Sequence, residues 1–232
     1  SITMPEGFAD IQRNSVNKSP GYKTLFERIT AKTGGKKQSL SWYRSAVKSE
    51  ASKYRKDPSR FSRDEKRDNV GKTEEKDENA LRHYVKAGHL YMFEYKAKMK
   101  WLPYYDMNPL VYVLKTSGND HFYGANLHYL SPKKRILVVQ KLMKGMIDIP
   151  KVCIHKYINA HVEGMFLDLA SVEWDTAILL PVEEFVKDVQ GHKFPYDHEL
   201  VWAETNEKFY DKVKARRIIK GYGKSSDITM AK

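Results

Sequence analysis

The stretch at residues 88–130 constrains the fold of this chain most strongly. Three short segments in it, at 90–95, 110–114 and 122–129, are rich in aromatic and β-branched residues. Pro, Gly, Asn and Asp residues, which favour turns, separate the three segments. This pattern predicts β-strands joined by turns. We therefore expect a small curled β-sheet, in which Gly124 allows a bulge or a close approach of two backbones.

The residues before this stretch predict a basic, helical N-terminal arm. Residues 1–21 carry few large apolar groups, whereas apolar residues at helical spacing predict short helices over 22–33 and 39–56. Residues 59–79 are almost wholly charged with both signs mixed, which is typical of a linker. The sequence thus divides into an arm at 1–80, a β-rich core domain at 81–190, and a C-terminal helix with a basic tail at 191–232.

Helices are expected around the sheet. Ser131 and Pro132 form a typical helix start. Apolar spacing predicts another helix over 151–162, and a strand, a turn and a second strand over 166–180. A short helix is predicted over 182–189 and a longer one over 200–219. The predicted fold class is therefore α+β, a curled sheet with peripheral helices.

The charge of the chain narrows the class of partner. The net charge is +12, and two thirds of it lies in residues 1–86. Such an excess favours phosphate backbones or acidic protein surfaces, although a solvated surface explains it as well. No apolar run is long enough to cross a bilayer, and residues 1–14 lack the pattern of a signal peptide. The single cysteine, Cys153, fits a reducing environment.

Basic and aromatic residues gather at three places that could contact a partner. The first surrounds the helix predicted over 39–56 and comprises Lys36, Lys37, Trp42, Tyr43, Arg44, Lys48, Arg55 and Lys56. Such a set suits phosphate contacts and base stacking, and it equally suits a helix docked on its own protein. The second place is the first turn after Ser131, where cations oppose the helix dipole, and it comprises Lys133, Lys134 and Arg135. The third is an aromatic loop that either covers the core or contacts a partner, with Trp101, Tyr104 and Tyr105.

No motif predicts catalysis. The eight histidines lack the spacing of zinc ligands, and glycine-rich phosphate loops are absent from the sequence. Cys153 lies on a predicted apolar face, which indicates a buried and inert thiol. A nuclease could use three carboxylates as magnesium ligands if they met in space: Asp106, Glu173 and Asp175. Their spacing in the sequence does not show that they meet. We expect no metal, no cofactor and no enzymatic activity.

The central stretch resembles one known family of small barrels. The strand beginning at Gly88 in GHLYMFEY and the apolar strand in NPLVYVL are similar to the SH3-like barrels of growth-inhibiting ribonuclease toxins. This resemblance implies an SH3-like curled sheet or barrel. Asn108 stands where that family has an arginine before the proline, so ribonuclease activity is not expected.

A second resemblance covers more of the chain. The segments SLSWYRSAVKS, LPYYD, GANLHYL and VEWDTAILL are similar in order and wording to proteins of large contractile-tailed bacteriophages. Such proteins are virion-associated or morphogenetic, some are labelled DNA end protectors, and they supply no catalytic residues. The chain departs from them in its longer charged linker and at Asn108, where relatives tend to have an aromatic residue.

This second resemblance implies a component of a phage particle. The main hypothesis is a non-enzymatic structural or assembly protein at the neck, portal or baseplate of the virion, assembled in the host cytoplasm. It would act in multiple copies through contacts with other virion proteins. The alternative is a protector that binds the ends of the packaged double-stranded DNA, and a nuclease is the third hypothesis. No membrane partner is expected.

Overall fold

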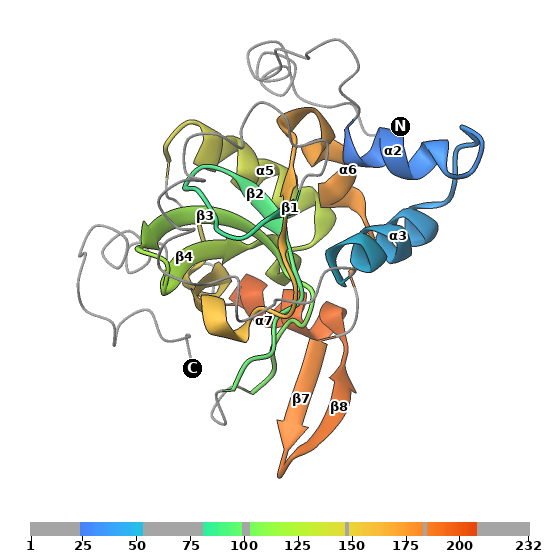
Figure 1. Cartoon of the computed structure of the whole chain (residues 1–232). Coiled ribbons are helices and arrows are strands. Elements are labelled where there is room, and N and C mark those ends of the chain that lie inside the picture. The colour runs from blue at the N-terminus through green and yellow to red at the C-terminus, as the bar shows by residue number, and fades with distance from the viewer. Residues whose placement is uncertain (1–23, 53–80, 99–102, 147–148, 183–184, 208–232) are drawn as a thin grey trace.

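The computed structural model describes residues 24–52, 81–98, 103–146, 149–182 and 185–207 (Figure 1). Within these ranges, a sheet of six strands occupies the centre, helices pack around it, and a separate two-stranded hairpin extends from the body. The combination of helices and strands confirms the predicted mixed class.

All pairings in the central sheet are antiparallel. Its spatial order is β1-β6-β2-β3-β4-β5. The strands are β1 (Leu81–Arg82), β2 (Leu90–Met92), β3 (Leu110–Ser117), β4 (His121–Asn126), β5 (Ile154–Ile158) and β6 (Phe166–Leu169). Because β1 and β5 each pair on one side only, the sheet stays open. Of the two predicted forms, a curled sheet or a barrel, the described residues form a sheet and no closed barrel, and an SH3-like class is not confirmed.

The central stretch forms the strands that its sequence predicts. Strands β2, β3 and β4 form at the segments predicted at 90–95, 110–114 and 122–129. Their bounds differ, because β2 ends at Met92, β3 continues to Ser117, and β4 ends at Asn126, where a 3₁₀ helix, η2 (Leu127–Tyr129), follows. Gly124 permits the expected close approach, because a Cβ placed there would lie 2.1 Å from Cγ1 of Val111. The pairing of β3 with β4 is also irregular between Val113 and Lys115, as a bulge requires.

Two predicted helices are wrong. Residues 151–162 form 3₁₀ helix η3 (Lys151–Cys153), strand β5 and 3₁₀ helix η4 (Asn159–His161), because β4 offers an edge on which Tyr157 pairs with Phe122. The short helix predicted over 182–189 is instead strand β7 (Phe185–Val189), which pairs with β8 (His192–Tyr196). Gln190 and Gly191, with φ values of 51° and 85°, make the tight turn that allows this pairing.

The segments at 166–180 and 200–219 agree with the predicted secondary structure in part. Residues 166–180 begin with the predicted strand, β6, but continue as 3₁₀ helix η5 (Ser171–Glu173) and helix α6 (Trp174–Leu179) in place of a second strand. Trp174 is buried there and its Nε1–H donates to Leu169 O at 2.8 Å, which fixes the helix against the sheet. Helix α7 (His198–Glu207) covers the start of the helix predicted over 200–219, and the rest of that prediction lies outside the described residues.

The core lies on both faces of the sheet. One buried cluster joins the sheet to α2 (Leu25–Ala31), α3 (Leu40–Ser52), α5 (Pro132–Met143), α6 and α7. The other face is an aromatic cluster that includes Tyr91, Phe93, Phe122, Tyr157 and Phe166. The described part of the predicted N-terminal arm is thus docked on the core, whereas the rest of the arm and the C-terminal tail lie outside the described residues. The three domain boundaries stay a prediction.

Candidate nucleic-acid interface

The outer face of helix α5 is basic. Its buried side consists of Arg135, Ile136, Val138, Val139 and Leu142. The other side carries four lysines, two exposed and two half-buried, which we call the α5 lysine stripe: Lys133, Lys134, Lys141 and Lys144. At about 100° per residue, the stripe and the exposed Leu137 fall within about 100° of the helix circumference. No acidic residue occurs in the helix.

The cations of the first turn do not serve the stability of the helix, because Lys133 and Lys134 oppose its dipole there. Lys141 and Lys144 lie at the C-terminal end, where their charges complement the dipole, although they repel each other at a spacing of three residues. From Lys133 to Lys144 the stripe runs about 16 Å along the axis. Duplex DNA carries one negative charge per about 1.7 Å, so the stripe can reach more than one phosphate. The structure thus presents the basic residues that the sequence predicts at 133 and 134, together with two that it did not.

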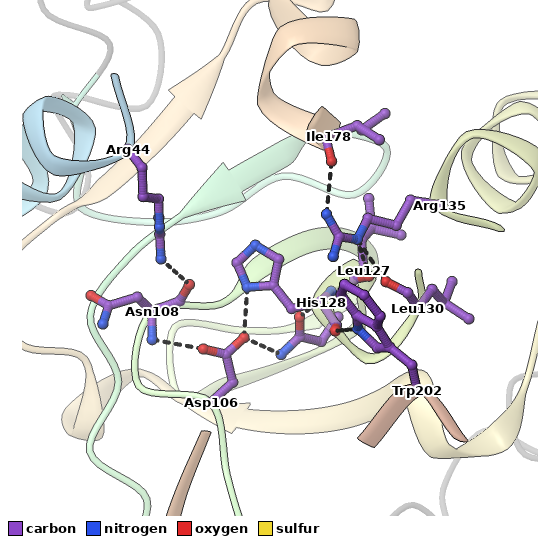
Figure 2. A network of polar contacts seen from close by, with 10 residues as sticks. Arg44, Asp106, Asn108, Leu127, His128, Leu130, Arg135, Ile178 and Trp202 are labelled. Atoms are coloured by element: carbon purple, nitrogen blue, oxygen red, sulfur yellow. Dashed lines mark hydrogen bonds and ion pairs between the residues drawn. The ribbon is translucent and has the colours of Figure 1, made fainter. Parts of the chain in front are cut away.

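Arg135 is the exception in this basic run, because its side chain points into the protein. It is 1% exposed, its Nε–H donates to the carbonyl oxygens of Leu127 and Leu130 at 3.0 and 2.7 Å, and its Nη1–H donates to Ile178 O at 2.8 Å (Figure 2). The guanidinium also lies 5.4 Å from the ring centre of Trp202. Arg135 is therefore not available to an anionic partner. Its role is to fix the first turn of α5 to the core.

Next to Arg135, a buried carboxylate organises the surrounding chain. Asp106 Oδ1 accepts from the Asn108 backbone N–H at 2.9 Å, and Oδ2 accepts from Asn126 Nδ2 at 3.0 Å and from His128 Nδ1 at 2.8 Å (Figure 2). Arg44 of α3 donates to Asn108 O at 3.1 Å. We call this set the Asp106 network; it comprises Arg44, Asp106, Asn108, Asn126, His128, Arg135 and Trp202, the last of which donates to His128 O at 2.9 Å.

The charges of the Asp106 network follow from burial and hydrogen bonding. Burial alone would raise the pKa of Asp106, but His128 and the two other donors, Asn126 and the Asn108 backbone N–H, outweigh it and lower that pKa, so the group is a carboxylate. Burial lowers the pKa of His128 to about 4, although Asp106 partly offsets this, so the ring is neutral and donates from Nδ1. Burial lowers the pKa of Arg135 to about 10, which leaves it charged at neutral pH.

The Asp106 network therefore has an architectural role. His128 is 0% exposed and Asp106 is 6% exposed, so no substrate reaches this acid and imidazole pair in the described conformation. Its hydrogen bonds join α3, the loop at 106–108, η2, α5, α6 and α7. A single buried carboxylate and two buried guanidiniums thus hold α5 in a fixed orientation, with its lysine stripe outward.

The residues predicted around α3 separate into exposed and buried ones. Tyr43 and Arg44 are buried, and Trp42 is half-buried against Tyr43, with the ring centres 5.3 Å apart. The exposed members are Lys36, Lys37 and Lys48, and Arg55 and Lys56 lie outside the described residues. A nucleic-acid contact at α3 would therefore depend on the lysines, since the two aromatic residues pack on the core.

The aromatic loop packs on its own protein where the structure describes it. Tyr104 and Tyr105 are buried, and Trp101 lies outside the described residues. Tyr104 stacks on Tyr196 with ring centres 4.6 Å apart, and both hydroxyls donate to the carboxylate of Glu204, at 2.9 and 2.8 Å. Of the two open interpretations of this loop, the structure supports the lid for Tyr104 and Tyr105.

The three carboxylates of the nuclease hypothesis have separate partners. Asp106 belongs to the buried network, Glu173 Oε1 accepts from Phe26 N–H at 2.7 Å, and Asp175 accepts from Thr176 N–H at 2.7 Å. Within the described ranges, no group of three or more His, Cys, Asp or Glu side chains could hold a metal ion. Cys153 is buried, and burial raises the pKa of its thiol. The described part of the chain also contains no helix of the length and apolarity that a membrane span needs.

Sequence reasoning missed Lys141 and Lys144 as members of the basic face. The signal was present, because they follow Lys133 by eight and eleven residues and so return to its side of a helix. Following the helical periodicity of the basic residues beyond the first turn could therefore have identified Lys141 and Lys144.

Comparison with known proteins adds one finding. The family described as phage T4 terminal DNA protecting protein matches residues 43–153. The match confirms the resemblance to contractile-tailed phage proteins that the sequence motifs indicated. No curated protein and no solved structure matches the chain. The matched segment contains the α5 lysine stripe and every member of the Asp106 network except Trp202, whereas β7, β8 and α7 lie beyond it.

Proposed function

We propose that this phage protein is a DNA end protector, which binds the ends of linear double-stranded DNA and shields them from nucleases without cleaving DNA itself. The observation that carries the proposal is the family match at residues 43–153, since the matched family is described as protecting terminal DNA. The α5 lysine stripe supports it, because it is a surface set of cations inside the matched segment.

The proposed mechanism is occlusion driven by electrostatics. The net charge of +12 attracts the polyanion over a distance, and lysines that neutralise phosphates release condensed counterions. Because Arg135 and the Asp106 network fix α5 to the core, the stripe meets the phosphates without first becoming ordered. A chain held at the terminus then blocks the access of an exonuclease, and this needs no metal, cofactor or catalytic group.

The structural role predicted from the sequence is the second candidate. The family description names DNA protection and not assembly, so a position at the neck, portal or baseplate has weaker support. A protector that stays on packaged ends would also travel inside the virion after assembly in the host cytoplasm. Virion association is therefore part of our proposal, and contacts with other virion proteins in multiple copies stay a prediction.

The salt dependence of DNA binding tests the proposed interface. A variant with Lys133, Lys134, Lys141 and Lys144 replaced by Gln should lower the slope of log affinity against log salt by about 0.9 for each phosphate contact that is lost. The matched control replaces four exposed lysines elsewhere by Gln, which gives the same net charge of +8: Lys32, Lys86, Lys96 and Lys98. Equal losses of affinity and slope in the two variants would show that only net charge matters, and would refute the α5 interface.

A further inference from the structure

The hairpin of β7 and β8 extends away from the body of the protein (Figure 1), and the described residues attach it at its base. Phe185 is 0% exposed within the core. Val186 and Tyr105 exchange two backbone hydrogen bonds, at 2.8 and 2.9 Å. Tyr196, at the end of β8, stacks on the buried Tyr104. The base of the hairpin is therefore firmly attached to the sheet domain.

Beyond this base, the hairpin gains little from burial. Residues 187–195 are all exposed. An unsupported two-stranded hairpin is marginally stable in water. Its turn is set locally, by the positive φ values of Gln190 and Gly191 and by a hydrogen bond from Gly191 N–H to Asp188 Oδ1 at 2.9 Å. A projecting element of this kind presents its side chains to a partner and contributes little to the core.

One face of the hairpin combines an aromatic ring with a lysine and a histidine. Side chains alternate between faces along a strand, and directly paired residues share a face. Phe194 pairs with Lys187, and His192 pairs with Val189, so these four side chains lie on one side. Phe194 is 52% exposed, and it is the only aromatic residue among the large hydrophobic side chains that are exposed in the described part of the chain.

We propose that Phe194 stacks on the terminal base pair of duplex DNA while Lys187 contacts the adjoining phosphates. This inference rests on the proposed function and says which element recognises the end. Phosphates are alike along the whole duplex, so the α5 lysine stripe cannot by itself distinguish an end from the interior. The terminal base pair differs from all others in having one uncovered flat face. An exposed planar ring matches that face, and stacking tolerates any sequence.

The composition of this face favours DNA over a protein partner. Lysine is depleted in protein interfaces, which place several apolar side chains in a buried centre. The hairpin face instead offers one ring and one valine between Lys187 and His192. On the opposite face Lys193 pairs with Asp188, so the uncompensated lysine of the hairpin is Lys187, on the face of Phe194.

The test uses the full chain and two duplexes of equal sequence. One duplex has free ends with 2-aminopurine in the terminal base pair, and the other is a dumbbell whose ends are closed by covalent loops. Phe194→Ala should reduce the preference for free ends by about 5- to 150-fold, the range for loss of one base-stacking contact, and should abolish the quenching of 2-aminopurine. Phe194→Trp should keep both properties. The matched control is Leu200→Ala on α7, because Leu200 is also 52% exposed, and it should change neither.

The outcomes separate the inference from the proposed function. A wild-type chain with no preference for free ends would refute the proposed function and this inference with it. An end preference that survives in Phe194→Ala would overturn the inference alone. Loss of self-association or of a virion protein contact in Phe194→Ala, with end preference unchanged, would also overturn it and assign the hairpin to protein binding. Equal urea midpoints for all variants exclude a loss of folding as the cause.

Discussion

The substitution Asp106→Asn tests whether the buried network organises the fold around α5. The two side chains have nearly the same shape, but an amide has one oxygen where the carboxylate has two. Oδ1 and Oδ2 of Asp106 accept from donors on opposite sides, Asn108 N–H on one and the side chains of Asn126 and His128 on the other. Whichever way the substituted amide turns, its NH₂ group faces at least one of these donors.

The expected cost comes from the lost hydrogen bond and from the lost charge. A hydrogen bond to a charged group contributes about 1.5–3 kcal/mol. The substitution also removes the negative charge that Asp106 places near the buried guanidinium of Arg135, and removing one partner from buried charges costs about 3–5 kcal/mol. We expect Asp106→Asn to lower the free energy of unfolding by about 3–5 kcal/mol, a large part of the roughly 5–15 kcal/mol typical of a folded protein.

The chain offers a matched control for this experiment. Asp120 also accepts from a histidine Nδ1, that of His121, at the same distance of 2.8 Å, but its side chain is 83% exposed. Asp120→Asn should change the free energy of unfolding by less than about 0.5 kcal/mol. Urea unfolding followed by tryptophan fluorescence measures both variants. A loss below about 1 kcal/mol for Asp106→Asn, or equal losses for the two, would refute the organising role of the buried carboxylate.

Burial and close packing support three further predictions. Burial lowers the pKa of His128 and His155 to about 4 from 6.5, so the unfolded chain binds more protons between these pH values, and the free energy of unfolding should fall from pH 6.5 to 4. The slope should reach about 1.4 kcal/mol per pH unit for each histidine, and a flat profile would contradict it. Cys153 should react with a thiol reagent only after unfolding, because it is buried; rapid labelling of the native chain would show otherwise. Gly124→Ala should cost about 1–3 kcal/mol in urea unfolding, since the new Cβ would clash with Val111, and an unchanged stability would disprove the close approach.

Local sequence signals were sufficient for the centre of the sheet and insufficient for β5. The strands β2, β3 and β4 are short aromatic and β-branched runs with turn residues between them, so neighbouring residues decide their structure. In residues 151–162 the apolar positions suit either a helix face or a strand. Pairing with β4 makes this segment a strand. This pairing joins residues that are distant in sequence, such as Tyr157 and Phe122.

The candidate site was predictable in part for a similar reason. Lys133, Lys134 and Arg135 look alike as a basic run, yet each step along a helix turns by about 100°. Val138, Val139 and Leu142 follow Arg135 at helical spacing and share its buried face, so the periodicity already separated Arg135 from its neighbours. Its hydrogen-bond acceptors were not predictable, because Ile178 O comes from a helix 43 residues away. The Asp106 network depends on the same kind of distant contact.

Protection of DNA ends is the central claim, and exonuclease digestion tests it most directly. A linear duplex is incubated with the full chain at physiological salt, and its degradation from the free ends is compared with cleavage of an internal site by an endonuclease. We predict that a few chains for each end stop the exonuclease while the internal site stays open to cleavage. Exonuclease digestion that proceeds unchanged, or that slows only when the chain coats the whole duplex and blocks the internal site equally, would contradict the account.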